Sequence, residues 1–87
     1  MHAVVVNVTI NDPEAAIAAL REQVVPQASG APGFVAGYWV RLGENRGTSI
    51  AVFGSEDAAR AAADQVQRPG DFVRMDSVEV GEVVGSA

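Results

Sequence analysis

The chain has 87 residues, of which 48% are hydrophobic, and it carries a formal net charge of -5. This length and composition predict one globular domain spanning residues 1–87. The negative charge disfavours binding to nucleic acids and to anionic membrane surfaces, because the mean field around the protein repels both.

The absence of cysteine excludes disulfides, thiolate metal ligands and cysteine nucleophiles. No apolar run approaches the about 18 residues of a membrane span, and the first residues do not form a basic, cleavable leader. We therefore expect a cytoplasmic protein that is neither secreted nor inserted into a membrane.

The first half of the chain predicts a strand followed by a helix. Residues His2–Ile10 alternate between two sets with a period of two and are rich in β-branched side chains. Asp12 is a suitable helix cap, and Pro13 is tolerated in a first helical turn. The helix is predicted to end near Val25, because Pro26 follows it.

The second half predicts a hairpin, a helix and a last strand. The polar, glycine-bounded segment Gly43–Gly47 is typical of a hairpin connection, and Ser55 is suited to cap a helix. The predicted elements are a strand at Phe34–Leu42, a strand at Thr48–Phe53, a helix to about Gln67 and a strand at Val73–Val84.

This order of elements predicts the fold class. Two β-α-β halves joined by a hairpin, with right-handed crossovers, give an α+β ferredoxin-like domain: a four-stranded antiparallel sheet with both helices on one face. Strict alternation in the second strand puts Phe34 and Tyr38 on one face and Val35 and Trp39 on the other. Because both faces carry apolar bulk and two helices cover only one, we expect a homodimer that buries the other.

Several polar and aromatic side chains are candidates for a ligand site. Asn7 could orient a ligand by hydrogen bonding, Trp39 could stack on an aromatic ring, and Arg41 could neutralise a carboxylate or enolate. The alternative for Asn7 is a polar position on the less buried strand face, and for Trp39 it is core or interface packing. The acidic residues of the last strand form no metal-ligand motif, so no metal site is expected.

Two segments resemble the antibiotic biosynthesis monooxygenase-like family: Pro32-Gly33-Phe34 before the second strand, and residues 53–59, Phe-Gly-Ser-Glu-Asp-Ala-Ala, before the second helix. The resemblance implies a dimeric α+β barrel, in which many members hold a pocket between sheet and helices. It also implies one of several activities, because some members oxidise aromatic polyketides without metal or flavin and others degrade haem.

The resemblance carries over to single positions. Asn7 matches a first-strand asparagine of the haem-degrading members, and Phe53 stands where those members have a tryptophan. The histidine that ligates haem iron in them corresponds to Ala62 here, so no cofactor is expected.

The sequence thus predicts a homodimer that binds a small apolar or aromatic molecule in a pocket lined by some of Asn7, Trp39, Arg41 and Phe53. One alternative is a cofactor-independent monooxygenase acting on an aromatic, polyketide-like substrate. Another is a structural or regulatory dimer without a ligand.

Overall fold

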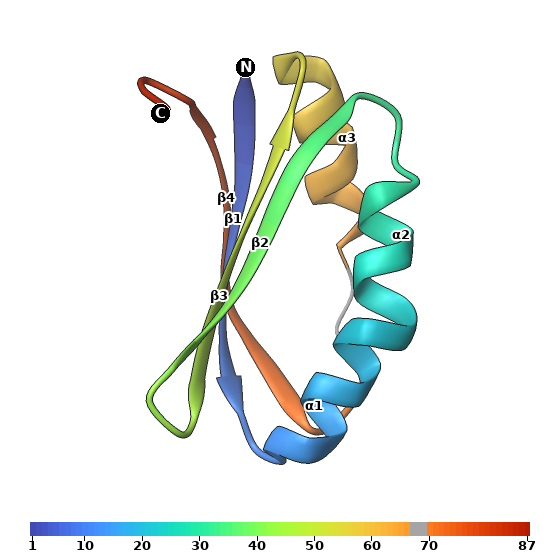
Figure 1. Ribbon diagram of the computed structural model, residues 1–87, viewed down its shortest axis with the longest axis vertical. Helices are drawn as coiled ribbons and strands as arrows, with labels where there is room; N and C mark the ends of the chain where they lie inside the picture. The colour runs from blue at the N-terminus through green and yellow to red at the C-terminus, as the bar shows by residue number, and fades with distance from the viewer. Residues whose placement is uncertain (67–69) are drawn as a thin grey trace.

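In the described part of the chain, one antiparallel sheet forms one side of the molecule and the helices lie on the other side (Figure 1). The computed structural model describes residues 1–66 and 70–87. The strands are β1 (His2–Ile10), β2 (Phe34–Leu42), β3 (Arg46–Phe53) and β4 (Val73–Glu82). Their order in the sheet is β2-β3-β1-β4, which confirms the predicted ferredoxin-like α+β fold.

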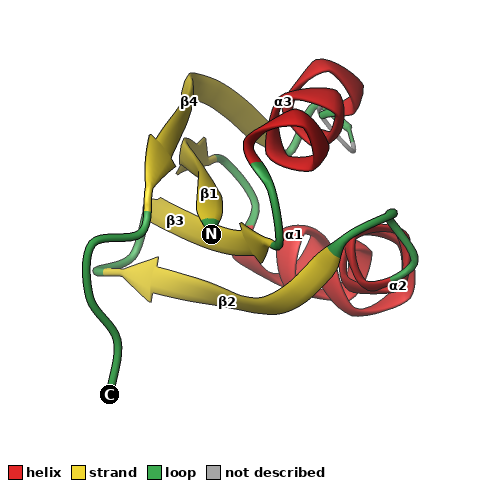
Figure 2. Cartoon of the chain, turned by 90° about the horizontal axis from the view of Figure 1, so that it is seen from above, coloured by secondary structure: helices red, strands yellow, loops and turns green. Residues whose placement is uncertain are grey.

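Two helical segments cover the sheet on the same face, as the view from above shows (Figure 2). The first comprises α1 (Pro13–Ala19), a π-helical turn η1 (Leu20–Val24) and α2 (Val25–Ser29), and the second is α3 (Glu56–Gln65). Both begin with a side-chain cap: Ala15 N–H donates to Asp12 Oδ1 at 3.3 Å, and Ala58 N–H donates to Ser55 Oγ at 3.1 Å. These caps satisfy N–H groups that a helix start leaves without partners.

Pro26 does not end the first helical segment, so the predicted end near Val25 is wrong. The segment continues to Ser29, and the preceding turn is π-helical, with the Val25 N–H donating to the Leu20 carbonyl, five residues back. This wider turn changes the carbonyl positions that a proline ring meets in a regular α-helix. The end predicted for α3, Gln67, lies outside the described residues.

A bulge near the start of β2 changes which side chains share a face. Phe34 pairs with Phe53 but Ala36 pairs with Val52, so the register shifts between them. The extra residue brings Phe34 to the helix-covered face together with Trp39, contrary to strict alternation. The predicted grouping of Phe34 with Tyr38 is therefore wrong.

The buried core is small and lies between α3 and the centre of the sheet. Its contiguous cluster consists of Val4, Phe53 and Ala59, which are 3%, 2% and 0% exposed. The other buried hydrophobic residues are Ala3, Ile10, Ala19 and Val73. The Phe53 ring meets Phe34 edge-to-face, with 5.9 Å between the ring centroids. The small side chain of Ala59 lets α3 approach the sheet closely, but it contributes little buried apolar area.

Gly33, just before β2, requires the conformational freedom of glycine. Its φ is +80°, a Cβ there would lie 2.8 Å from Ala58 Cβ, and its carbonyl accepts from Gly54 N–H at 2.9 Å. We expect Gly33→Ala to lower the free energy of unfolding by about 1–3 kcal/mol, measured by urea denaturation. Gly43→Ala is the matched control, because Gly43 also has positive φ (+67°) but no atom within 4 Å. Equal losses in the two variants would contradict a role for the Ala58 contact.

Candidate ligand-binding cleft

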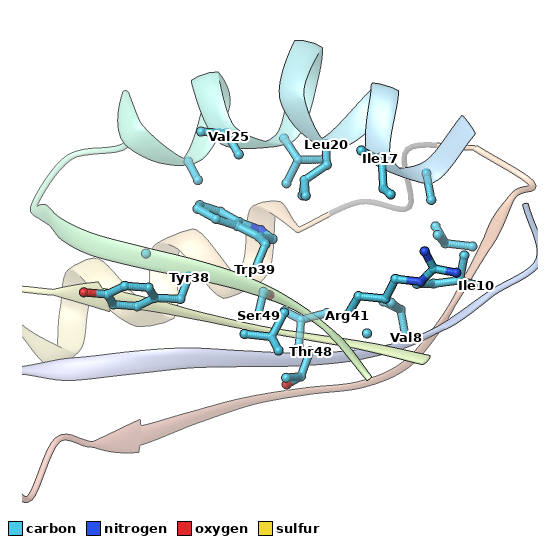
Figure 3. A pocket seen from close by; sticks show the side chains of 18 of the residues that line it. Val8, Ile10, Ile17, Leu20, Val25, Tyr38, Trp39, Arg41, Thr48 and Ser49 are labelled. Atoms are coloured by element: carbon cyan, nitrogen blue, oxygen red, sulfur yellow. The ribbon is translucent and has the colours of Figure 1, made fainter. Parts of the chain in front are cut away.

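A cavity of about 660 Å³ lies between the sheet and the helical segment 13–29 (Figure 3). Its floor is the helix-covered face of β1, whose side chains at alternate positions all point the same way. Its roof is one stripe of the helical segment. The main apolar lining residues are Val4, Val6, Val8 and Ile10 from β1, and Ile17, Leu20, Val24 and Val25 from the roof.

Trp39 lies inside this cavity, below Leu20 and Val25 (Figure 3). Its ring folds back over Gly37, two residues earlier on the same face, because a Cβ at Gly37 would lie only 2.9 Å from Trp39 Cη2. The missing side chain at position 37 thus lets the indole lie along the strand. The result is a flat aromatic surface that faces an apolar space, an arrangement suited to stacking.

The charged groups of the cavity are both arginines. Arg41 follows Trp39 on the same face of β2, and Arg21 lies one helical turn after Ile17 on the roof. Among the described residues that line the cavity there is no aspartate or glutamate. The Arg41 side chain donates from Nη2 to the Glu44 carbonyl at 3.3 Å.

A second cavity of about 710 Å³ adjoins the first and extends below α3. Val4, Val24, Ala28, Ala51 and Val66 line both cavities. The wall formed by α3 consists largely of alanine, which leaves space below it. Together the two cavities form one long cleft between the sheet and the helices.

The four predicted site residues are not all in one place. Trp39 and Arg41 line the first cavity, whereas Phe53 lines the second and belongs to the buried core. Asn7 alternates with the cavity residues of β1, so its side chain lies on the opposite face of the sheet, where Nδ2 donates to Ser77 Oγ at 3.0 Å. The structure brings Trp39 and Arg41 together and separates Asn7 from them.

Three features of the cavity were missed in the sequence. Arg21 could have been found from the sequence, because it lies four residues after Ile17 and so shares a helix face with that apolar residue. Ser49 lies directly opposite Trp39 in the β2–β3 register, which only the pairing reveals. Gly37 gives no signal of its own, because its role depends on the rotamer of Trp39.

The face of the sheet turned away from the helices carries an exposed apolar patch. We call it the outer patch, and its members are Tyr38, Val40 and Leu42 of β2 and Ile50 of β3. Tyr38 is 65% exposed and Ile50 is 40% exposed. Such a patch on the flat side of a sheet is typical of a surface that another protein surface covers.

The same face has a polar cluster near β4. Thr9 Oγ1 donates to Asp76 Oδ2 at 2.7 Å, and Arg74 Nε donates to Asp76 Oδ1 at 2.9 Å. The hydrogen bond from Thr9, followed by that from Arg74, holds the pKa of the Asp76 carboxyl below its ordinary value. This cluster lies where the β1–β4 register shifts, so the bulge turns the carboxylate toward Thr9.

In residues 1–66 and 70–87, no three histidine, cysteine, aspartate or glutamate side chains come together as a metal site would require. Within the same ranges, no helix has the length and apolar character needed to cross a bilayer.

Comparison with known proteins links this fold to several solved structures. No protein-family profile and no curated protein sequence matches the chain. HapK from Hahella chejuensis superposes with a TM-score of 0.75 at 15% identity, covering 100% of this chain and 96% of that one. A mutant of SnoaB, described as a cofactor-independent oxygenase from Streptomyces nogalater, gives 0.71 at 18% identity, covering 98% and 95%.

A third structure is the heme-degrader MhuD from Mycobacterium tuberculosis with two hemes bound. It superposes with a TM-score of 0.60 at 23% identity over 98% of each chain. At these identities the comparisons establish the fold, which matches over the whole length of the chain. This protein therefore shares the ferredoxin-like α+β fold of these three proteins, as the order of its predicted elements indicated.

Proposed function

We propose that this protein is a homodimer that binds a small apolar or aromatic molecule in the cavity below helical segment 13–29. The observation that carries this proposal is the apolar cavity of about 660 Å³ with Trp39 inside it. Ligand pockets of proteins are commonly of this size, mostly apolar, with a few polar groups that fix orientation. The polar residues that line this cavity include Arg21, Arg41 and Ser49.

Haem does not fit the described lining of either cavity. Neither cavity has a described histidine or cysteine, the side chains that most often ligate haem iron, and Ala62 lines the second one. Met75 offers a thioether in the first cavity, but methionine ligates haem iron together with a histidine. We therefore propose an organic ligand without a metal centre, in contrast to what is described for MhuD.

The homodimer part of the proposal depends on the outer patch. A second copy that packs the same patch against the first would remove Tyr38, Val40, Leu42 and Ile50 from water around a two-fold axis. The small core supplies a further reason, because buried interface area would add stability that Val4, Phe53 and Ala59 provide only in part.

A second candidate function is cofactor-independent monooxygenation of an aromatic substrate. SnoaB, whose fold this chain shares, is described as a cofactor-independent oxygenase. An activated ring methylene would lose a proton, and the carbanion would react with O₂, so that one oxygen stays as a carbonyl and the other leaves as water. The described lining has no aspartate, glutamate or histidine to take that proton. The site therefore fits a substrate that is acidic enough to lose this proton to water without a protein base. Arg21 and Arg41 would then stabilise the resulting anion.

Calorimetric titration with neutral and ionised naphthalene derivatives tests the proposed function. We expect saturable binding, with one site per chain, that weakens about tenfold or more in Ala16→Phe, because the ring would occupy the cavity that Ala16 lines. Ala18→Phe is the matched control, since Ala18 is exposed on the same helix and does not line the cavity. Equal binding by the two variants, or no binding of any probe, would contradict the proposal.

An oxygen electrode separates a catalyst from a binder. Oxygen consumption with anthrone above the uncatalysed rate, lost in Ala16→Phe and retained in Ala18→Phe, would establish the monooxygenase. Binding without oxygen consumption would indicate a binding protein that is not an oxygenase. A dimer that binds none of the probes would indicate a structural or regulatory role.

A further inference from the structure

We infer that the natural ligand is an apolar anion, a molecule with an aromatic or aliphatic body and one carboxylate or ionised phenol, whose charge is held by Arg41 together with Arg21. This inference rests on the proposed function, because it names the chemical class of the molecule in the same cavity.

The described charges in the first cavity are all positive. The chain has 11 acidic and 6 basic residues, yet the described charged residues around the cavity are Arg21 and Arg41. A neutral aromatic ligand would gain only cation–π attraction from two guanidinium groups. An anion would gain from both, through an attraction that water partly screens because Arg21 and Arg41 are exposed residues.

These two arginines lack carboxylate partners within the described chain. Arg60 pairs with Glu56 and Arg74 pairs with Asp76, whereas neither Arg21 nor Arg41 has a described carboxylate oxygen within ion-pair distance. The bond from Arg41 to the Glu44 carbonyl uses one donor and leaves the charge of the guanidinium unneutralised. A planar guanidinium with available N–H groups matches the two oxygens of a carboxylate.

The spacing of side chains along β2 also fits such a ligand. Trp39 and Arg41 are two residues apart on one face, which places their Cα atoms about 7 Å apart along the strand. This is close to the long dimension of a bicyclic aromatic ring. Arg41 lies opposite Gly47, where a side chain would meet Val8 and Ile10, so the glycine keeps the space beside the guanidinium open. Figure 3 shows Arg41 toward the Ile10 and Ile17 end and Trp39 below Leu20 and Val25.

The test compares 2-naphthoate with its neutral counterpart 2-naphthalenemethanol, by calorimetry at pH 7 and low salt. We expect the anion to bind about tenfold more tightly, since hydrogen bonds to charged groups are stronger than neutral ones. In Arg41→Gln the affinity for naphthoate should fall to that of the alcohol, whose own affinity stays unchanged. Arg21→Gln should lose less affinity for naphthoate than Arg41→Gln does. Arg41→Lys should keep part of the affinity that Arg41→Gln loses.

Arg46→Gln is the control variant, because Arg46 lies at the same end of the sheet, is exposed and does not line the cavity. It should keep the full preference for naphthoate. Equal binding of acid and alcohol by the wild type would overturn the anion inference while leaving cavity binding intact. Binding of neither probe would overturn the proposed function as well. If Arg41→Gln kept its full preference for naphthoate over the alcohol, the proposed role of Arg41 in holding the anion would be wrong.

Discussion

Replacing Phe53 with alanine is expected to lower the free energy of unfolding by about 3–5 kcal/mol, a typical loss for a buried phenylalanine. Phe53 is 2% exposed, packs against Val4 and Ala59, and meets Phe34 edge-to-face. Because domains of this size commonly have about 5–15 kcal/mol of stability, much of the folded population would be lost. Thermal unfolding followed by circular dichroism measures the effect.

Phe53→Leu is the conservative comparison, because it keeps much of the apolar volume and should lose less stability than the alanine variant. Val84→Ala is the exposed control, since Val84 is 90% exposed and should change stability very little. A loss below about 1 kcal/mol for Phe53→Ala would contradict the position of the core.

The second large effect is expected at the outer patch, where Ile50→Asp should convert the proposed dimer into a monomer. Ile50 pairs with Val5 on one side and Tyr38 on the other, so it lies in the interior of the sheet face. An unpaired carboxylate buried between two sheets costs about 3–5 kcal/mol, enough to raise the dimer dissociation constant more than about a hundredfold. Light scattering after gel filtration should change from twice 9.0 kDa to 9.0 kDa.

Ala18→Asp is the control for the added charge, because Ala18 is exposed on α1, away from the outer patch. It should remain a dimer with the same thermal stability. A wild-type chain that elutes as a monomer at micromolar concentration, or an Ile50→Asp variant that stays dimeric, would contradict the proposed interface.

The fold could be predicted from the sequence because its local signals agree with the final packing. The alternation in residues 2–10, the caps at Asp12 and Ser55 and the polar hairpin each act over a few residues, and β1 and β2 match their predicted bounds. Pro26 shows where this reasoning failed. A proline signal describes a regular α-helix, whereas the chain forms a π-helical turn just before it.

The candidate site was predicted only in part, and the reason is geometric. Trp39 and Arg41 lie two residues apart, so they share a face of the sheet, and the bulge between Phe34 and Ala36 does not change this. Placing Asn7 in their pocket required knowing which face of β1 the helices cover, and alternation alone treats the two faces equally. The bulge near Phe34 adds a shift that depends on pairing with β3, which no local pattern in β2 encodes.

The junction between the two cavities has a consequence for the length of a ligand. Ala28 of α2 and Ala51 of β3 line both cavities from opposite sides of the cleft, and each contributes a single methyl group there. A molecule seated on Trp39 that is too long for the first cavity therefore has room to continue below α3. Larger side chains at positions 28 and 51 would close this passage and shorten the longest ligand that fits. The two alanines thus bear on ligand size, independently of the arginines proposed to select charge.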